Sequence, residues 1–449
     1  MISGTKDLTK GPILKQLVNL AIPIMGTSFI QMAYNLTDMA WVGRLGSESI
    51  AAVGSVGLLT WMAVSIALLN KVGSEVSVGQ SVGMQDEKMA RNFASHNITI
   101  SIILSIILGS IFFTFSNPII SLYGLSDNIS ESAVNYLRII STALPFVFMS
   151  AAFSGIFNGC GRSLVPFIIN GVGLVANMIL DPLLIFVFKM GTNGAAYATW
   201  IAQFTVFLLF IYKLEYKKSL LNGIPLIVSL KKEYTIKVLK LGIPVAVLNT
   251  LFAFANIFLG RIASSNGGHL GLMSLTTGGQ IEAVTWNTSQ GFSTALSSFV
   301  AQNYAAGKTF RIQKAFNITI ALAIAFGVLC SFAFIFYGCE IFSIFVPEIE
   351  AYTTGGRYLL IDGYSQIFMM IEITTQGMFY GVGRTIPPAV VSIGFNYIRI
   401  PLAIWFISLG MGLDGIWWSI SITSILKGII CLLWLFLIRK KLYTINKFI

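Results

Sequence analysis

Side chains with oxygen atoms recur at helical spacing in otherwise apolar stretches of this chain. Asn35 and Asp38 lie three residues apart, and Asn177 and Asp181 lie four apart, so each pair shares one face of a helix. Carboxylates, amides and hydroxyls are the groups that relay protons or bind a small hard cation such as Na⁺. The pattern predicts a proton or Na⁺ site in the N-terminal half, formed among Asn35, Asp38, Asn158, Asn177, Asp181, Thr199 and Gln203. Separate hydrogen bonds between helices are the alternative interpretation.

Other polar residues and one proline are candidates for coupling and for substrate contact. Pro23 lies in the first apolar stretch, about four turns before Asp38, where it removes a backbone hydrogen bond and permits a bend. Asn35 and Asn158 are, with Pro23, the candidate coupling residues. The candidate substrate contacts are Gln31, Tyr34, Glu282, Glu372 and Arg399. For Glu282 and Glu372, the alternative interpretation is an ion pair with a residue such as Arg399.

Composition places these residues inside a membrane. Hydrophobic residues make up 55% of the 449 residues and charged residues only 10%, whereas soluble domains carry about 25% charged residues. Apolar runs of about 18 to 25 residues recur, each long enough to cross roughly 30 Å of hydrocarbon. We predict twelve spans, near 14–40, 50–76, 92–116, 131–158, 164–188, 191–213, 235–260, 273–300, 316–339, 354–382, 386–408 and 413–438.

The chain also repeats itself at a spacing of about 222 residues. Residues 97–100 (NITI) recur at 317–320, Gly155 recurs as Gly377, and Ile22-Pro23 recurs as Ile243-Pro244. Duplicated sets of hydrophobic helices are typical of secondary transporters. We therefore expect an all-α membrane protein, with twelve transmembrane helices in two pseudo-symmetric six-helix lobes that form a V-shaped cleft. The expected divisions are an N-terminal lobe at 1–212 with the cation or proton site, a cytoplasmic linker at 213–234, and a C-terminal lobe at 235–449.

Charge and motifs narrow the function further. Most of the 29 lysines and arginines fall in loops on one side of the predicted membrane, which places both termini in the cytoplasm. The net charge of +11 reflects this asymmetry, because the basic residues form no compact module for nucleic acid. The sequence contains no HExxH, GxSxG or GxxxxGK[ST] motif and no cysteine pair at metal-site spacing. We expect neither an enzyme nor a bound cofactor.

Several stretches resemble the multidrug and toxin extrusion (MATE) family. They are residues 35–43, 177–182, 191–196 and 399–402, and the likeness extends over nearly the whole chain. It is closest to the prokaryotic DinF-like branch, whose acidic pair lies in the N-terminal lobe. In this family the residues that match Asp38, Asn177, Asp181 and Thr199 form the cation or proton site, with Asn158 nearby. The second half lacks the acidic pair, because Leu259 and Ile400 stand at the equivalent positions.

The resemblance implies a secondary active multidrug efflux transporter in the plasma membrane of a prokaryote. It would export small cationic or amphipathic organic compounds by H⁺ or Na⁺ antiport through alternating access, and we expect a monomer surrounded by membrane lipid. A lipid-linked oligosaccharide flippase of related fold is the alternative. Such a flippase needs cationic residues for a pyrophosphate headgroup, and Arg399 is the residue that supports this alternative.

Overall fold

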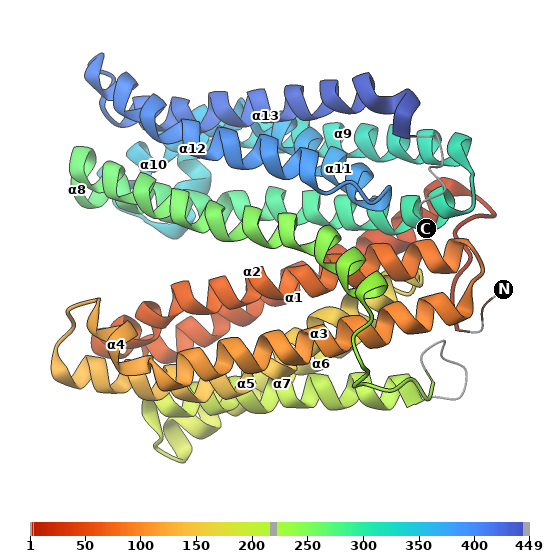
Figure 1. Cartoon of the computed structure of the whole chain (residues 1–449). Helices are drawn as coiled ribbons and strands as arrows, with labels where there is room; N and C mark the ends of the chain where they lie inside the picture. Colours follow the sequence, from red (N-terminus) through yellow and green to blue (C-terminus); the bar gives the residue numbers. More distant parts are fainter. Residues whose placement is uncertain (1, 3, 216–221, 443–449) are drawn as a thin grey trace. The chain divides into compact units, whose positions relative to one another are not determined.

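The computed structural model describes residues 2, 4–215 and 222–442. Within these residues all regular structure is helical (Figure 1). Residues 216–221 of the predicted linker and the tail beyond residue 442 lie outside this part of the chain. The helices are α1 (Ile13–Gly43), α2 (Ser47–Gly83), α3 (Glu87–Thr114), α4 (Ser116–Ser121), α5 (Asp127–Gly159), α6 (Leu164–Pro182), η1 (Leu183–Val187), α7 (Gly191–Glu215), α8 (Lys232–Ala305), α9 (Thr309–Phe345), α10 (Ile349–Gly363), α11 (Gln366–Gly381), α12 (Ile386–Ser408) and α13 (Gly412–Leu442).

The described helices supply the predicted number of membrane crossings. Ten of them are long and apolar enough to span a bilayer. The 74-residue α8 supplies two crossings, because its chain reverses direction (Figure 1). The non-helical backbone angles of Gly268 (φ 56°, ψ −141°) interrupt the helix. The shorter α10 and α11 together make one further crossing, broken at Tyr364 and Ser365. The all-α fold with twelve spans is thereby confirmed.

The chain forms two compact units. The N-terminal unit contains the described residues of Met1–Lys10 and Ile22–Ala246, and the C-terminal unit those of Gly11–Ala21 and Val247–Ile449. Thus α1 changes unit just before Pro23, and α8 changes unit just after Pro244. Compared with the predicted lobes, residues 11–21 belong to the C-terminal unit, and the described residues of 213–246 belong to the N-terminal unit. The division at 1–212, 213–234 and 235–449 stays a prediction.

Local contacts explain why the start of α8 belongs to the N-terminal unit. The segment before α8 lies along α3, where the Thr99 hydroxyl donates to the Leu226 carbonyl (3.2 Å). The Nε2 atom of His96 accepts a hydrogen bond from the Lys231 backbone N–H (3.1 Å). Further along α8, Gly242 packs directly on the backbone of Leu69 in α2. Residues 222–234 of the predicted linker are therefore held against the N-terminal unit.

Repeated glycines make the same helix contact in both units. In the N-terminal unit, a Cβ atom on Gly159 of α5 would lie 2.6 Å from the Glu75 carbonyl oxygen of α2. In the C-terminal unit, a Cβ on Gly381 of α11 would lie 2.7 Å from the Ser297 carbonyl oxygen of α8. Only a residue without a side chain permits such close backbone packing, which is a common way for membrane helices to associate. The sequence repeat therefore corresponds to a repeated packing arrangement.

Candidate functional site

Helix α6 has one buried face and one exposed face, and this division points two polar residues inward. Pro166, Ile169, Gly173, Asn177 and Asp181 are buried, and they follow one another at three- or four-residue spacing, as one helix face requires. The opposite face is exposed and apolar, as expected for contact with lipid. It contains Ile168, Val172, Val175 and Ile179.

Asn177 and Asp181 are both fully buried and contact each other. The Asn177 amide Nδ2 donates a hydrogen bond to Asp181 Oδ1 at 3.1 Å. The α-helix ends at Pro182, directly after Asp181, and continues as the π-helical turn η1. Proline cannot donate a backbone hydrogen bond, and π-helical turns are frequent at functional sites.

Helix α1 brings Tyr34 and Asp38 to this site. They lie four residues apart; Tyr34 is 9% exposed and Asp38 is partly buried. The Asp38 and Asp181 carboxylates are close enough to interact electrostatically. Gln31 and Asn35 are exposed side chains of the same helix. The structure thus brings together Asp38, Asn177 and Asp181, whereas the Asn35 side chain is exposed.

Helix α7 completes the site with Thr199 and Gln203. The Tyr34 hydroxyl faces both of these side chains and lies within electrostatic range of the two carboxylates. Contact between α6 and α7 is close because Gly173 has no side chain to meet Val206. A small pocket of about 10 Å³ adjoins the site, lined by Gln31, Tyr34, Gln203 and other residues of α1, α6 and α7. This volume is about the minimum that holds one water molecule.

Several oxygen atoms at this site are buried without a hydrogen-bond partner among the described residues. A buried acceptor without a donor is costly, and buried charges are normally paired or bind a cation. Carboxylate, amide and hydroxyl oxygens fit Na⁺, and a carboxylate can equally take up a proton. Asn158 of α5 has a similar buried amide oxygen without a hydrogen-bond partner among the described residues. The unpartnered acceptor atoms of the site are Asp38 Oδ1, Asn177 Oδ1 and Asp181 Oδ2.

Sequence comparison assigns the chain to a transporter family. The MatE family profile matches residues 23–183 and, a second time, residues 244–405. The chain belongs to the MatE family. Each half carries one copy of the MatE repeat, starting at Pro23 and at Pro244. Membership of this transporter family confirms the resemblance to multidrug and toxin extrusion proteins and the expectation that the chain is not an enzyme, while the DinF-like branch stays a prediction.

Relatives and solved structures agree over nearly the full length of this MatE chain. It is 26% identical over 420 residues to the Thermotoga maritima protein named "Probable multidrug resistance protein NorM". The aligned region covers 90% of this chain and 88% of that protein. Crystal structures of a MATE protein in a bent and in a straight conformation match with TM-scores of 0.92 and 0.89, both at 24% identity. They cover 98% of this chain and 98% and 99% of theirs, which shows a shared fold.

The C-terminal unit of the MatE chain contains a buried charged network instead of unpartnered carboxylates. Glu372 Oε2 lies 3.2 Å from Lys427 Nζ. Its Oε1 accepts hydrogen bonds from the Ser392 hydroxyl (2.5 Å) and from the Gln376 amide (3.0 Å). Lys427 also donates to Asn396 Oδ1 at 3.2 Å. Glu372 is therefore held by neighbours within its own unit.

Glu282 and Arg399 lie in the same part of the C-terminal unit. The Tyr358 hydroxyl donates to Glu282 Oε2 at 3.2 Å, and Arg399 lies within electrostatic range of Glu282. The Arg399 guanidinium donates to the hydroxyls of Thr423 (3.0 Å) and Ser424 (3.1 Å). The structure thus brings Glu282 and Arg399 together in one polar region.

The sequence reading overlooked Lys427 and the part that Tyr34 plays. Lys427 is a cation inside the last apolar run and is only 7% exposed, and such a residue in a membrane span was itself a signal of a buried partner. The structure places the Tyr34 hydroxyl beside Thr199, and its contact with substrate stays a prediction. Tyr34 lies four residues before Asp38, and this spacing indicates that the two side chains share one face of α1.

Proposed function

We propose that this MatE-family protein exports small cationic or amphipathic organic compounds by antiport with H⁺ or Na⁺ through alternating access. Support for the substrate class comes from the name of the Thermotoga maritima relative, a multidrug resistance protein. Support for the coupling ion comes from Asp38 and Asp181, two carboxylates in one membrane-embedded site. The transporter works as a monomer in a prokaryotic plasma membrane, with both termini in the cytoplasm.

One observation carries the coupling proposal: the buried oxygen atoms of Asp38, Asn177 and Asp181 that lack a donor. Two carboxylates near each other in a medium of low dielectric constant cannot both remain charged without large cost. A bound Na⁺ compensates this charge, and a proton removes part of it. Either ion therefore stabilises the arrangement in which the carboxylates are close together.

Pro23 suggests how ion binding moves substrate. Because Pro23 has no backbone N–H, the helix hydrogen bonding of α1 is interrupted one turn before it. Here α1 is a continuous helix through Pro23, and the Thr27 hydroxyl donates to the Pro23 carbonyl at 2.9 Å. We propose that α1 has straight and bent forms of similar free energy, a proposal in keeping with the two conformations named for the solved MATE structures. Ion binding at Asp38 shifts this equilibrium through its different affinity for the two forms.

The flippase alternative has less support. It depended on Arg399 as a contact for a pyrophosphate headgroup, but Arg399 donates its hydrogen bonds to Thr423 and Ser424. The multidrug name of the Thermotoga maritima relative favours organic compounds as cargo. The two carboxylates of Asp38 and Asp181 also favour a positively charged substrate over an anionic pyrophosphate headgroup.

Transport in sealed liposomes tests the proposal. The purified protein is reconstituted, and movement of a fluorescent lipophilic cation is followed under a pH gradient alone and under a Na⁺ gradient alone. At least one gradient is expected to drive transport in the wild type, and Asp38→Asn is expected to abolish it. Asp127→Asn, which changes an exposed carboxylate at the start of α5, is the matched control. Full gradient-driven transport by Asp38→Asn would rule out the coupling role of this residue.

A further inference from the structure

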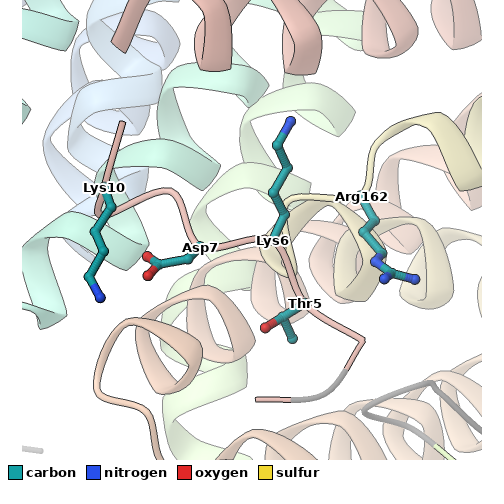
Figure 2. A pocket seen from close by; sticks show the side chains of 5 residues that line it. All are labelled: Thr5, Lys6, Asp7, Lys10 and Arg162. Carbon is teal, nitrogen blue, oxygen red and sulfur yellow. The ribbon is translucent and has the colours of Figure 1, made fainter. Parts of the chain in front are cut away.

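The N-terminal unit has a second polar site, at the opposite end of α6 from Asp181. An open depression of about 470 Å³ is lined by Thr5, Lys6, Asp7, Lys10 and Arg162 (Figure 2). Three of these five side chains are cationic and one is acidic, so the depression carries a net positive charge. The proposed cation site does not use any of these residues.

Backbone contacts hold Lys6 next to Arg162. The Lys6 N–H donates to the Cys160 carbonyl at 2.9 Å. Gly161 has a positive φ of 75°, and a Cβ atom there would lie 3.1 Å from the Lys6 carbonyl oxygen. Glycine is the residue that adopts this backbone conformation without strain. The turn between α5 and α6 therefore holds the Lys6 backbone next to Arg162, and the two side chains extend in different directions from it (Figure 2).

Buried apolar residues fix the N-terminal segment in this position. Leu8 is fully buried and Ile2 is 6% exposed. Between the cationic residues, Asp7 Oδ1 accepts hydrogen bonds from the Thr9 N–H (2.8 Å) and the Thr9 hydroxyl (2.6 Å). The single Asp7 charge offsets only one of the three cationic side chains that line the depression, so a net positive charge remains that attracts an external anion.

The exposed apolar face of α6 begins directly after Arg162. Leu164 and Ile168 are each 54% exposed, and this face continues along α6 to Ile179. A ligand with a negatively charged group at the depression can therefore place a long apolar portion along α6. A soluble anion has no use for this apolar surface, whereas a phospholipid matches both features.

We propose that this depression binds the phosphate headgroup of an acidic membrane phospholipid, whose acyl chains lie against the exposed face of α6. The side chains of Lys6, Lys10 and Arg162 extend in different directions around the depression (Figure 2), and together they supply the positive charge that attracts the phosphate. The loop charges place this end of α6 at the cytoplasmic membrane surface, where lysines and arginines attract acidic lipids. The site is independent of the proposed transport function.

Native mass spectrometry of the detergent-solubilised full chain tests this assignment. The lipids are phosphatidylglycerol and, for comparison, zwitterionic phosphatidylcholine. Each cation at a membrane surface contributes about 1 kcal/mol, or about five-fold in affinity. The double variant Lys6→Gln/Arg162→Gln is therefore expected to bind phosphatidylglycerol about 25-fold more weakly than the wild type, with little change in its weak binding of phosphatidylcholine.

The internal repeat offers a matched control. Arg384 occupies the equivalent position in the second half, is also exposed, and follows Gly383 with a φ of 82°. Arg384→Gln is expected to bind phosphatidylglycerol as the wild type does, and inorganic phosphate is expected not to displace the lipid. Equal binding of the two lipids by the wild type, unchanged lipid binding by the double variant, an equal loss in Arg384→Gln, or displacement by phosphate would each overturn the proposal.

Discussion

Individual buried charges are compensated differently in the two units. Glu372 and Lys427 are 3.2 Å apart and both are surrounded by hydrogen-bonding side chains. The ion pairs found among the described residues do not include Asp38 or Asp181. Buried charges that lack a fixed partner are expensive, which supports the proposal that an ion binds at Asp38 and Asp181. Paired charges serve instead to hold helices together.

The Glu372–Lys427 pair allows a direct test of this difference. Lys427→Met leaves the Glu372 carboxylate buried without its counter-charge, which typically costs about 3–5 kcal/mol. We expect the unfolding free energy of the detergent-solubilised variant to fall by that amount. Adding Glu372→Gln removes the isolated charge, so the double variant is expected to recover most of the loss.

The exposed pair of Arg357 and Asp414 is the control for this measurement. Their side chains are 54% and 32% exposed, with 2.8 Å between charged atoms. Exposed pairs contribute about 0–1 kcal/mol, so Arg357→Met is expected to have a small effect. A loss for Lys427→Met no larger than for Arg357→Met would contradict the structural role of the buried pair.

At the level of helices, close packing depends on the repeated glycines. A Cβ atom on Gly155 would overlap the Lys71 carbonyl oxygen, and one on Gly377 would overlap the Ser293 carbonyl oxygen. Both contacts involve backbone atoms, which cannot move aside as the end of a flexible side chain can. The two contacts stabilise equivalent pairs of helices, α5 with α2 and α11 with α8.

Alanine at either position is therefore expected to destabilise the protein. Overpacking costs about 1–3 kcal/mol, and Gly155→Ala and Gly377→Ala are expected to lower the unfolding free energy by similar amounts in this range. Gly54→Ala in α2 is the control, because a Cβ there has no heavy atom within 4 Å. It is expected to leave stability unchanged or to raise it by less than about 1 kcal/mol. Equal effects of all three variants would show that the close contacts are not important.

Helix α1 provides a second prediction at this level. Pro23→Ala restores the missing backbone donor and so favours the straight helix. If bending couples the ion site to export, this variant keeps ion binding but loses most gradient-driven efflux. Ion binding is measured by the protection of the solubilised protein against thermal unfolding, and efflux is measured in liposomes. A Pro23→Ala protein with normal efflux would favour movement of the units as rigid bodies.

At the scale of the whole chain, the units do not coincide with the sequence halves. The N-terminal unit includes the first part of α8 up to Ala246, and the C-terminal unit includes Gly11–Ala21. In the C-terminal unit, Arg311 holds this short segment by donating to the Gly11 carbonyl (2.8 Å) and to Gln16 Oε1 (3.1 Å). Each unit therefore depends on a segment from the other half of the chain.

This exchange predicts how fragments behave. A fragment of residues 1–250 includes the α8 segment that packs on Leu69, whereas a fragment of residues 1–215 lacks it. We expect the longer fragment to yield more monodisperse protein in detergent and to resist trypsin longer. A fragment in which residues 216–250 are replaced by a flexible linker of equal length controls for chain length. Equal behaviour of the three fragments would contradict a stabilising role for this segment.

The sequence by itself determined the features that depend on local pattern. Apolar runs predict the spans because the cost of burying backbone and charge in lipid depends on each segment alone. The four-residue spacing of Asn177 and Asp181 predicts their shared face, and these two residues do hydrogen bond. The repeat of Gly155 as Gly377 is visible as a sequence match and corresponds to equivalent backbone contacts.

Only the tertiary structure decided which helices bring their polar residues together. Asn35 and Tyr34 are adjacent on α1, yet Tyr34 faces Thr199 while Asn35 is exposed. Lys427 and Glu372 lie 55 positions apart, and helical periodicity carries no information about pairing over such a separation. The rotation of each helix about its axis is set by packing against its neighbours. For that reason the sequence predicts candidate residues of a site, whereas the packing of the helices determines which of these residues contact each other.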